Sequence, residues 1–134
     1  MNIFLIRPAL TCLLSLLLIY PAFASDVNDE LTSIVSLTKR LDAQYAPNAI
    51  VTPEAAAMAL QESDAAQLRL QAWVTQAESA CHQKFFVNSC LSDVRVERRA
   101  SLDILHRIAT EAKALQRRVH IQQLDEALAR KQSQ

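Results

Sequence analysis

The most informative feature of this 134-residue sequence is an absence, because it contains no glycine. Average usage of about 7% would give roughly nine glycines in a chain of this length. Glycine supplies positive φ angles and lets the backbone approach a ligand closely. Without it, the sequence excludes phosphate-cradling loops, the dinucleotide fingerprint and the Gly-x-Ser-x-Gly elbow of hydrolases, and tight β-hairpin turns are disfavoured. The composition therefore predicts an all-α protein built from long helices and a few open loops.

The chain also lacks an excess of either charge, with 14 basic and 14 acidic residues. Proteins dedicated to nucleic-acid binding usually carry a clear basic excess, so we expect no nucleic-acid partner. The charges are nevertheless unevenly distributed. Residues 25–80 contain eight acidic and three basic residues, whereas residues 81–134 contain six acidic and ten basic residues. Such asymmetry indicates either that the two halves pack on each other or that the basic half meets an anionic partner.

Residues 1–24 have the pattern of a secretory signal peptide. Arg7 precedes an apolar run over residues 9–20, which is too short for a comfortable membrane span. Residues 22–24 read Ala-Phe-Ala, a small-x-small cleavage site, so we expect cleavage after Ala24 and a periplasmic or secreted location. Cys12 lies inside the apolar run and would be removed. The expected mature protein is a single domain covering residues 25–134.

Export leaves an even pair of cysteines, Cys81 and Cys90, in an oxidising compartment, and a disulfide between them is the favoured interpretation. It would close a loop of about ten residues and stabilise the fold by roughly 2.7 kcal/mol in the chain-entropy model. The alternative is a redox or metal-binding pair, but redox pairs usually have Cys-x-x-Cys spacing.

Apolar periodicity predicts three helices, over residues 26–45, over residues 53–81 after a Thr52 cap, and from an Asn88 or Ser89 cap to about residue 131. Pro47 should end the first helix, and Asn48 is the best candidate for a positive φ in the linker. The expected fold is a long antiparallel helical hairpin of coiled-coil type, with the disulfide at its tip and the shorter first helix packed against it. In the third helix the inward apolar spacing is lost after Val119, because Ile121, Leu124 and Leu128 fall on another face.

Two adjacent phenylalanines, Phe85 and Phe86, occupy the predicted tip between the cysteines. The favoured interpretation is that they fold back and cover the end of the helix pair. The alternative is an exposed hydrophobic knob that binds a partner.

The third helix carries a row of basic side chains. At 100° per residue, five of them fall within about 40° of each other. We call them the basic stripe: Arg95, Arg99, His106, Lys113 and Arg117. Like charges four residues apart cost an isolated helix a few tenths of a kcal/mol per pair. The acidic half of the chain, or water alone, would offset this cost in the simplest interpretation. The alternative is an anionic partner, such as a lipid head group, an envelope polymer or an acidic protein surface.

Nothing in the sequence predicts an enzyme, a metal site or a cofactor. His106 and His120 are two heptads apart, about 21 Å along a helix, and cannot share a metal ion. His82 beside Cys81 would be a metal pair only without the disulfide, and zinc sites need three or four ligands. No nucleophile has an identifiable base nearby in the sequence.

The Cys81–Cys90 segment with Phe-Val-Asn inside it, followed by Val94-Arg95 and Arg98-Arg99, resembles a group of small exported bacterial helical proteins of unassigned function. The resemblance covers about 40 residues. It implies an exported helical protein and implies no active site, cofactor or partner.

These observations favour a non-enzymatic periplasmic adaptor that binds another protein through its helical faces. One alternative is a holdase-type chaperone that grips unfolded proteins with the Phe85–Phe86 tip. Another is a binder of anionic membrane surfaces or envelope polymers through the basic stripe. Because elongated apolar stripes give a thin core, we also expect that a homodimer could form through the remaining apolar positions.

Overall fold

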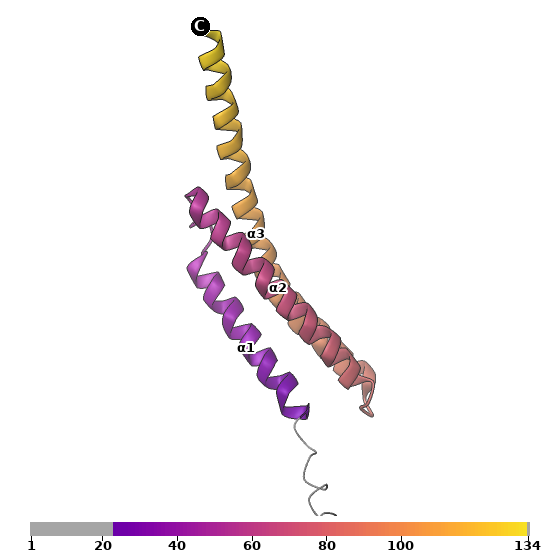
Figure 1. The fold of residues 1–134 in the computed structure, drawn as a ribbon. Coiled ribbons are helices and arrows are strands. Elements are labelled where there is room, and N and C mark those ends of the chain that lie inside the picture. The colour runs from indigo at the N-terminus through magenta and orange to yellow at the C-terminus, as the bar shows by residue number, and fades with distance from the viewer. Residues whose placement is uncertain (1–22, 134) are drawn as a thin grey trace, which may run out of the picture.

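The computed structural model describes residues 23–133, with side chains from residue 27 to residue 133. Three helices follow one another in this part of the chain, α1 (Phe23–Gln44), α2 (Pro53–Cys81) and α3 (Val87–Gln132). α2 and α3 form a long antiparallel hairpin, and α1 lies along it (Figure 1). The prediction of an all-α hairpin with a shorter first helix is confirmed. The predicted signal peptide lies outside the described residues except for Phe23 and Ala24, which begin α1.

α1 begins three residues earlier than predicted and ends at Gln44, one residue before the predicted end. The linker that follows contains Asn48 with a φ of 64°, as the sequence predicts. Asparagine tolerates this left-handed conformation better than most residues, which matters in a chain without glycine. The amide of Asn48 donates a hydrogen bond to Glu111 Oε2 at 3.0 Å, so the turn is attached to α3.

α2 begins as the sequence predicts, whereas α3 does not. The Thr52 side chain accepts a hydrogen bond from the amide of Ala55 at 3.1 Å, and Pro53 occupies the first helical turn. α3 begins at Val87 with Phe86 in the capping position and no side-chain cap. The predicted cap at Asn88 or Ser89 is therefore wrong. α3 begins earlier because the connection between the two helices is short. The disulfide requires Cys90 to be close to Cys81, and the chain is already helical before it reaches Asn88 or Ser89.

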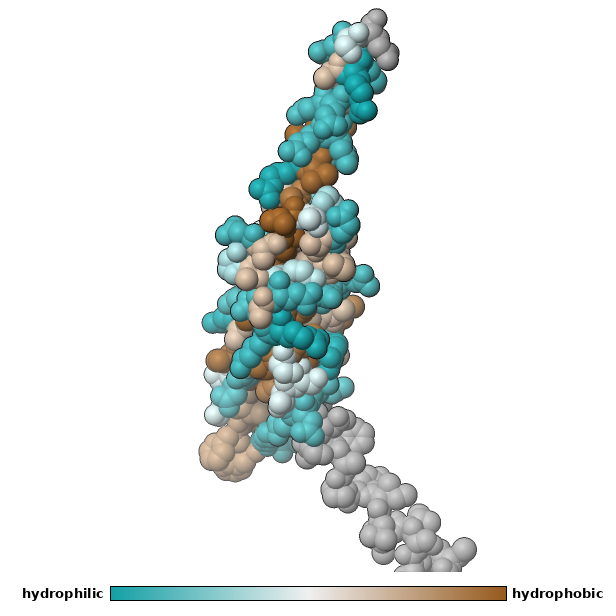
Figure 2. Space-filling model, turned by 90° about the vertical axis from the view of Figure 1, so that its left-hand side faces the viewer, coloured by the Kyte–Doolittle hydropathy of each residue, from teal (hydrophilic) through white to brown (hydrophobic). Residues whose placement is uncertain are grey.

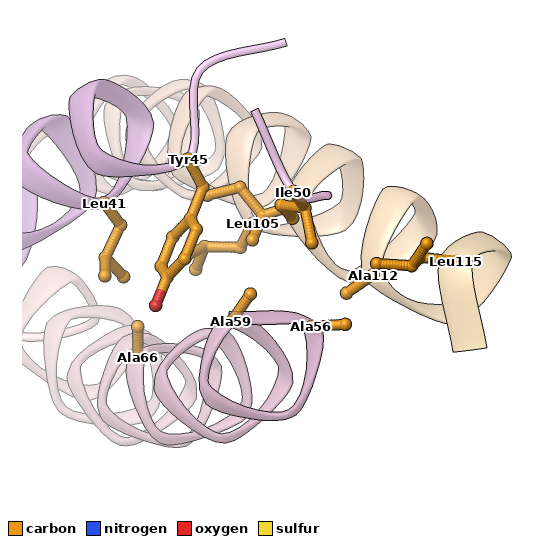
Figure 3. Close-up of a cluster of buried hydrophobic side chains, with 10 residues drawn as sticks. Leu41, Tyr45, Ile50, Ala56, Ala59, Ala66, Leu105, Ala112 and Leu115 are labelled. Atoms are coloured by element: carbon orange, nitrogen blue, oxygen red, sulfur yellow. The ribbon is translucent and has the colours of Figure 1, made fainter. Parts of the chain in front are cut away.

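The buried residues form two clusters along the hairpin. The first lies near the linker and contains Tyr45, Ile50, Leu105 and Ile108 among small α2 side chains (Figure 3). The second lies toward the tip and is built around Ile34, Leu70, Trp73 and Val94. Positions at helical spacing along one side of each helix are buried: Ala56, Leu70, Val74, Ala77 and Cys81 in α2, and Val94, Ser101, Leu105, Ile108 and Ala112 in α3. Leu60, Leu91 and Val119 are only partly buried.

α3 is much longer than its partner helices. At 1.5 Å per residue its 46 residues span about 69 Å, against about 44 Å for the 29 residues of α2. Its C-terminal part therefore continues alone beyond the start of α2 (Figure 1). Although the inward apolar spacing is lost after Val119, α3 is an uninterrupted helix to Gln132. No helix in the described part of the chain is both long and apolar enough to cross a membrane.

Candidate functional site

The hairpin tip is closed by the predicted disulfide between Cys81 and Cys90, whose Cα atoms are 5.5 Å apart. The cysteine that ends α2 is buried, and Cys90 is half-buried in the first turn of α3. The predicted disulfide is confirmed, and in this bonded state neither sulfur is a free thiolate that could bind a metal ion. Among residues 23–133, no group of three or more His, Cys, Asp or Glu side chains is arranged to hold a metal ion.

Phe85 and Phe86 are exposed at the tip, with 93% and 75% of their surface accessible. Their rings contact each other edge to face, with centroids 5.0 Å apart. The favoured expectation that they cover the helix ends is wrong. Only five residues connect Cys81 to Val87, and hydrogen bonds from Gln83 to Ala80 and from Lys84 to Cys81 tighten this connection into turns that point the rings outward.

All five residues of the basic stripe are exposed on α3. They extend from residue 95 to residue 117, about 33 Å of helix. Within the described residues, none of them has a carboxylate oxygen within 4.0 Å. The stripe is therefore not neutralised by direct ion pairs with the acidic half of the chain.

The ion pairs in the described part of the chain are instead made by two other arginines. Arg69 of α2 lies 2.8 Å from Glu30 of α1, and its guanidinium also donates to Ser33 Oγ at 3.1 Å. Arg107 of α3 lies 2.8 Å from Asp42 and 3.1 Å from Glu111. Both arginines attach α1 to the hairpin, and so the chain uses these carboxylates for its own tertiary structure.

The part of the stripe nearest the hairpin tip borders a shallow groove between α2 and α3. Two adjoining hollows share Arg98, Leu102 and His106. The first hollow is also lined by Asp64, Gln67, Leu68 and Gln71, and the second by Glu78, Arg95, Arg99 and Asp103. We call this surface the α2–α3 groove. It offers three arginines and a histidine beside three carboxylates, with Leu68 as its most exposed apolar side chain at 74%.

The structure thus brings Arg95, Arg99 and His106 together at the groove, while Lys113 and Arg117 lie farther along α3 toward its free end. Arg98, Leu102 and Leu68 also belong to this surface, and helical spacing in the sequence did not predict them. The Cys81–Cys90 disulfide could have predicted these three residues. Because it sets the antiparallel register of the two helices, it places Leu68 of α2 near the level of Leu102 of α3.

Comparisons of the chain with protein-family models, with curated proteins and with solved structures found no match.

Proposed function

We propose that this chain is a non-enzymatic interaction protein of the periplasm that binds an acidic surface of another protein along the basic stripe and the α2–α3 groove. The observation that carries the proposal is the unpaired state of the stripe within the described residues, although fourteen acidic residues are present in the chain. Like charges four residues apart destabilise a helix slightly. Binding to an acidic surface would offset this cost.

The spacing of the stripe favours a protein over a small anion. Its members follow one another at intervals of four, seven, seven and four residues. These intervals keep them on one side of α3 over about 33 Å. Arginine guanidinium groups bind carboxylates through paired hydrogen bonds. An extended acidic surface, such as a helix with carboxylates at heptad spacing, would meet several of these groups at once.

Crosslinking in living cells that express and export the protein tests this proposal. A photoreactive residue at Arg99 is expected to capture one dominant protein, because Arg99 lies in both the stripe and the groove. The matched control places the same residue at Arg40, an exposed basic position on α1. Equal capture at the two positions would contradict the proposal.

Charge reversal of the captured complex provides the second arm. Arg95→Glu with Arg99→Glu should weaken binding by about tenfold or more, and added salt should weaken the unmodified complex because exposed charges are screened. Lys39→Glu with Arg40→Glu changes the net charge equally on a different helix and should leave binding intact. If anionic phospholipid vesicles bind the purified protein and no protein is captured at Arg99, the stripe belongs to a membrane-surface or polymer binder instead.

The exposed phenylalanine pair favours a second candidate, a holdase-type chaperone. Two adjacent rings at 93% and 75% exposure form a projecting apolar contact at the end of a rigid hairpin. In this case the protein should suppress aggregation of a heat-denatured model enzyme, and Phe85→Ser with Phe86→Ser should remove that effect. Val96→Ser, at a 61% exposed valine away from the tip, is the matched control. Undiminished suppression by the double variant would exclude the tip as the client-binding surface.

A further inference from the structure

The C-terminal part of α3 carries an apolar face of which more than half is exposed. Its members are Ile121, Leu124 and Leu128, which are 56%, 51% and 57% exposed, and we call them the tail face. They lie beyond the start of α2, where α3 projects alone (Figure 1). Hydrophobic surface continues up this projecting segment in Figure 2.

The tail face has the spacing of a coiled-coil seam. Its three residues are separated by three and four positions, and Arg117 and Lys131 continue the same row at either end. At 100° per residue this row points about 170° away from the buried row that contains Leu105. A second helix can therefore reach the tail face from the side opposite α1 and α2 without displacing either.

We propose that the tail face binds a second copy of this chain, with the two α3 segments running antiparallel. The segment complements itself about the midpoint between Gln122 and Gln123. In that register, Ile121 lies opposite Leu124 of the second copy, and Leu124 lies opposite its Ile121. Arg118 and Asp125, which flank the seam on one side, then lie across from Asp125 and Arg118 of the second copy.

The charges exclude the parallel alternative. A parallel pair in register would place Arg117 opposite Arg117 and Lys131 opposite Lys131, which are repulsive contacts inside the seam. The antiparallel pair places each Arg117 opposite a Leu128, where the aliphatic part of the arginine covers apolar surface while its charge stays in water. Arg118 and Asp125 have no ion pair within the described residues, so both are free to form the intermolecular pair.

Pairing would need little reorganisation, because α3 is already helical to Gln132. A short helix that had to fold on binding would lose much of its binding energy to ordering. The α2–α3 groove remains open in this dimer, since the seam begins beyond it. The seam includes Arg117, the last member of the basic stripe, but leaves Arg95, Arg99 and His106 outside it at the groove. Capture of a protein at Arg99 without dimerisation, or dimerisation without capture, therefore distinguishes the two proposals.

Sedimentation equilibrium of the purified protein tests the association. We expect a concentration-dependent monomer–dimer equilibrium. Asp125→Arg should weaken the dimer by about tenfold or more, because in each of the two symmetry-related contacts it places an arginine across from Arg118 of the other copy. Arg118→Asp combined with Asp125→Arg exchanges the pair and should restore the dimer. Glu126→Arg makes the same change in charge at the neighbouring position, which lies outside the seam, and should leave the dimer intact. A monomer at all concentrations up to about 1 mM, or a dimer insensitive to Asp125→Arg, would overturn the proposal.

Cysteine crosslinking tests the orientation. Oxidation of a mixture of the Arg117→Cys and Leu128→Cys variants should join one chain of each kind, because these positions lie opposite each other. Leu128→Cys alone should not crosslink beyond the unmodified protein, because the two copies of residue 128 would lie about 16 Å apart along the helix axis, well beyond the Cα separation of a disulfide. Efficient crosslinking of Leu128→Cys alone would show a parallel pair and overturn the proposed arrangement.

Discussion

The hydroxyl of Tyr45 donates a hydrogen bond to Glu62 Oε2 across 3.0 Å, joining the residue that follows α1 to the first half of α2. The ring is buried in the first cluster, with the hydroxyl directed toward α2 (Figure 3). Burial and the neighbouring Glu62 carboxylate both raise the pKa of Tyr45 above its ordinary value of 10.0, burial being the larger cause. The folded state therefore holds the phenolic proton more tightly than the unfolded chain does.

This difference predicts how stability depends on pH in alkali. Because the pKa of Tyr45 is higher in the folded state, its contribution is fully present below pH 10 and is lost as the pH rises through the folded pKa. The free energy of unfolding should fall above pH 10, and part of this fall should be absent in Tyr45→Phe. Denaturant titrations of both proteins at pH 8 and above pH 10 measure this change in the free energy of unfolding. A parallel loss of stability in the two proteins would contradict the assigned pKa.

The second prediction concerns Arg107, which holds the C-terminal end of α1 against α3. Its guanidinium donates to Asp42 Oδ1 and to the carbonyl oxygen of Tyr45, both at 2.8 Å, and to Glu111 Oε1 at 3.1 Å. Arg107→Ala leaves these acceptors without a donor and should cost about 1–3 kcal/mol in the free energy of unfolding. Arg69→Ala is the control. Its ion pair is more exposed, with 45% of the arginine side chain accessible, so about 1 kcal/mol or less is expected.

The third prediction concerns the tip disulfide. Replacing Cys81 and Cys90 by serine should lower the free energy of unfolding by roughly 2–3 kcal/mol, because the bond restricts the unfolded chain. Thermal unfolding with and without a reductant should give the same change for the unmodified protein. The serine variant, which has no bond to lose, should be insensitive to the reductant. A Tm of the unmodified protein that does not change on reduction would contradict a stabilising role.

The fourth prediction concerns the small buried residues of α2. Ala66 is 1% exposed and Ser63 is fully buried, and Ala66 belongs to the first cluster, in which Tyr45 also lies (Figure 3). Ala66→Leu would force a larger side chain into this cluster and should destabilise the protein by about 1–3 kcal/mol. Ala65→Leu is the matched control, because Ala65 is exposed on the same helix. Equal effects of the two substitutions would show that Ala66 is not packed in the core.

The candidate site was only partly predictable from the sequence. Helical periodicity placed Arg95, Arg99 and His106 on one side of a helix, since residues on one helix share a fixed geometry. Arg98 belongs to the same surface because it lines the groove between α3 and α2. Only the packing of the two helices shows this. The exposure of Phe85 and Phe86 was also out of reach, because adjacent apolar residues in a loop are compatible with folding inward or outward.

The sequence by itself determined the elements of this protein. Its lack of glycine, its apolar spacing, the Thr52-Pro53 start and the Cys81–Cys90 pair predicted an all-α hairpin, because each acts through local geometry or covalent chemistry. The tertiary structure decided which charges are used within the chain and which are left free. Arg69 and Arg107 pair with carboxylates of α1, whereas the basic stripe does not. Such pairing depends on how α1 is placed against the hairpin, and the contacts that set this placement join residues about 40 to 65 positions apart.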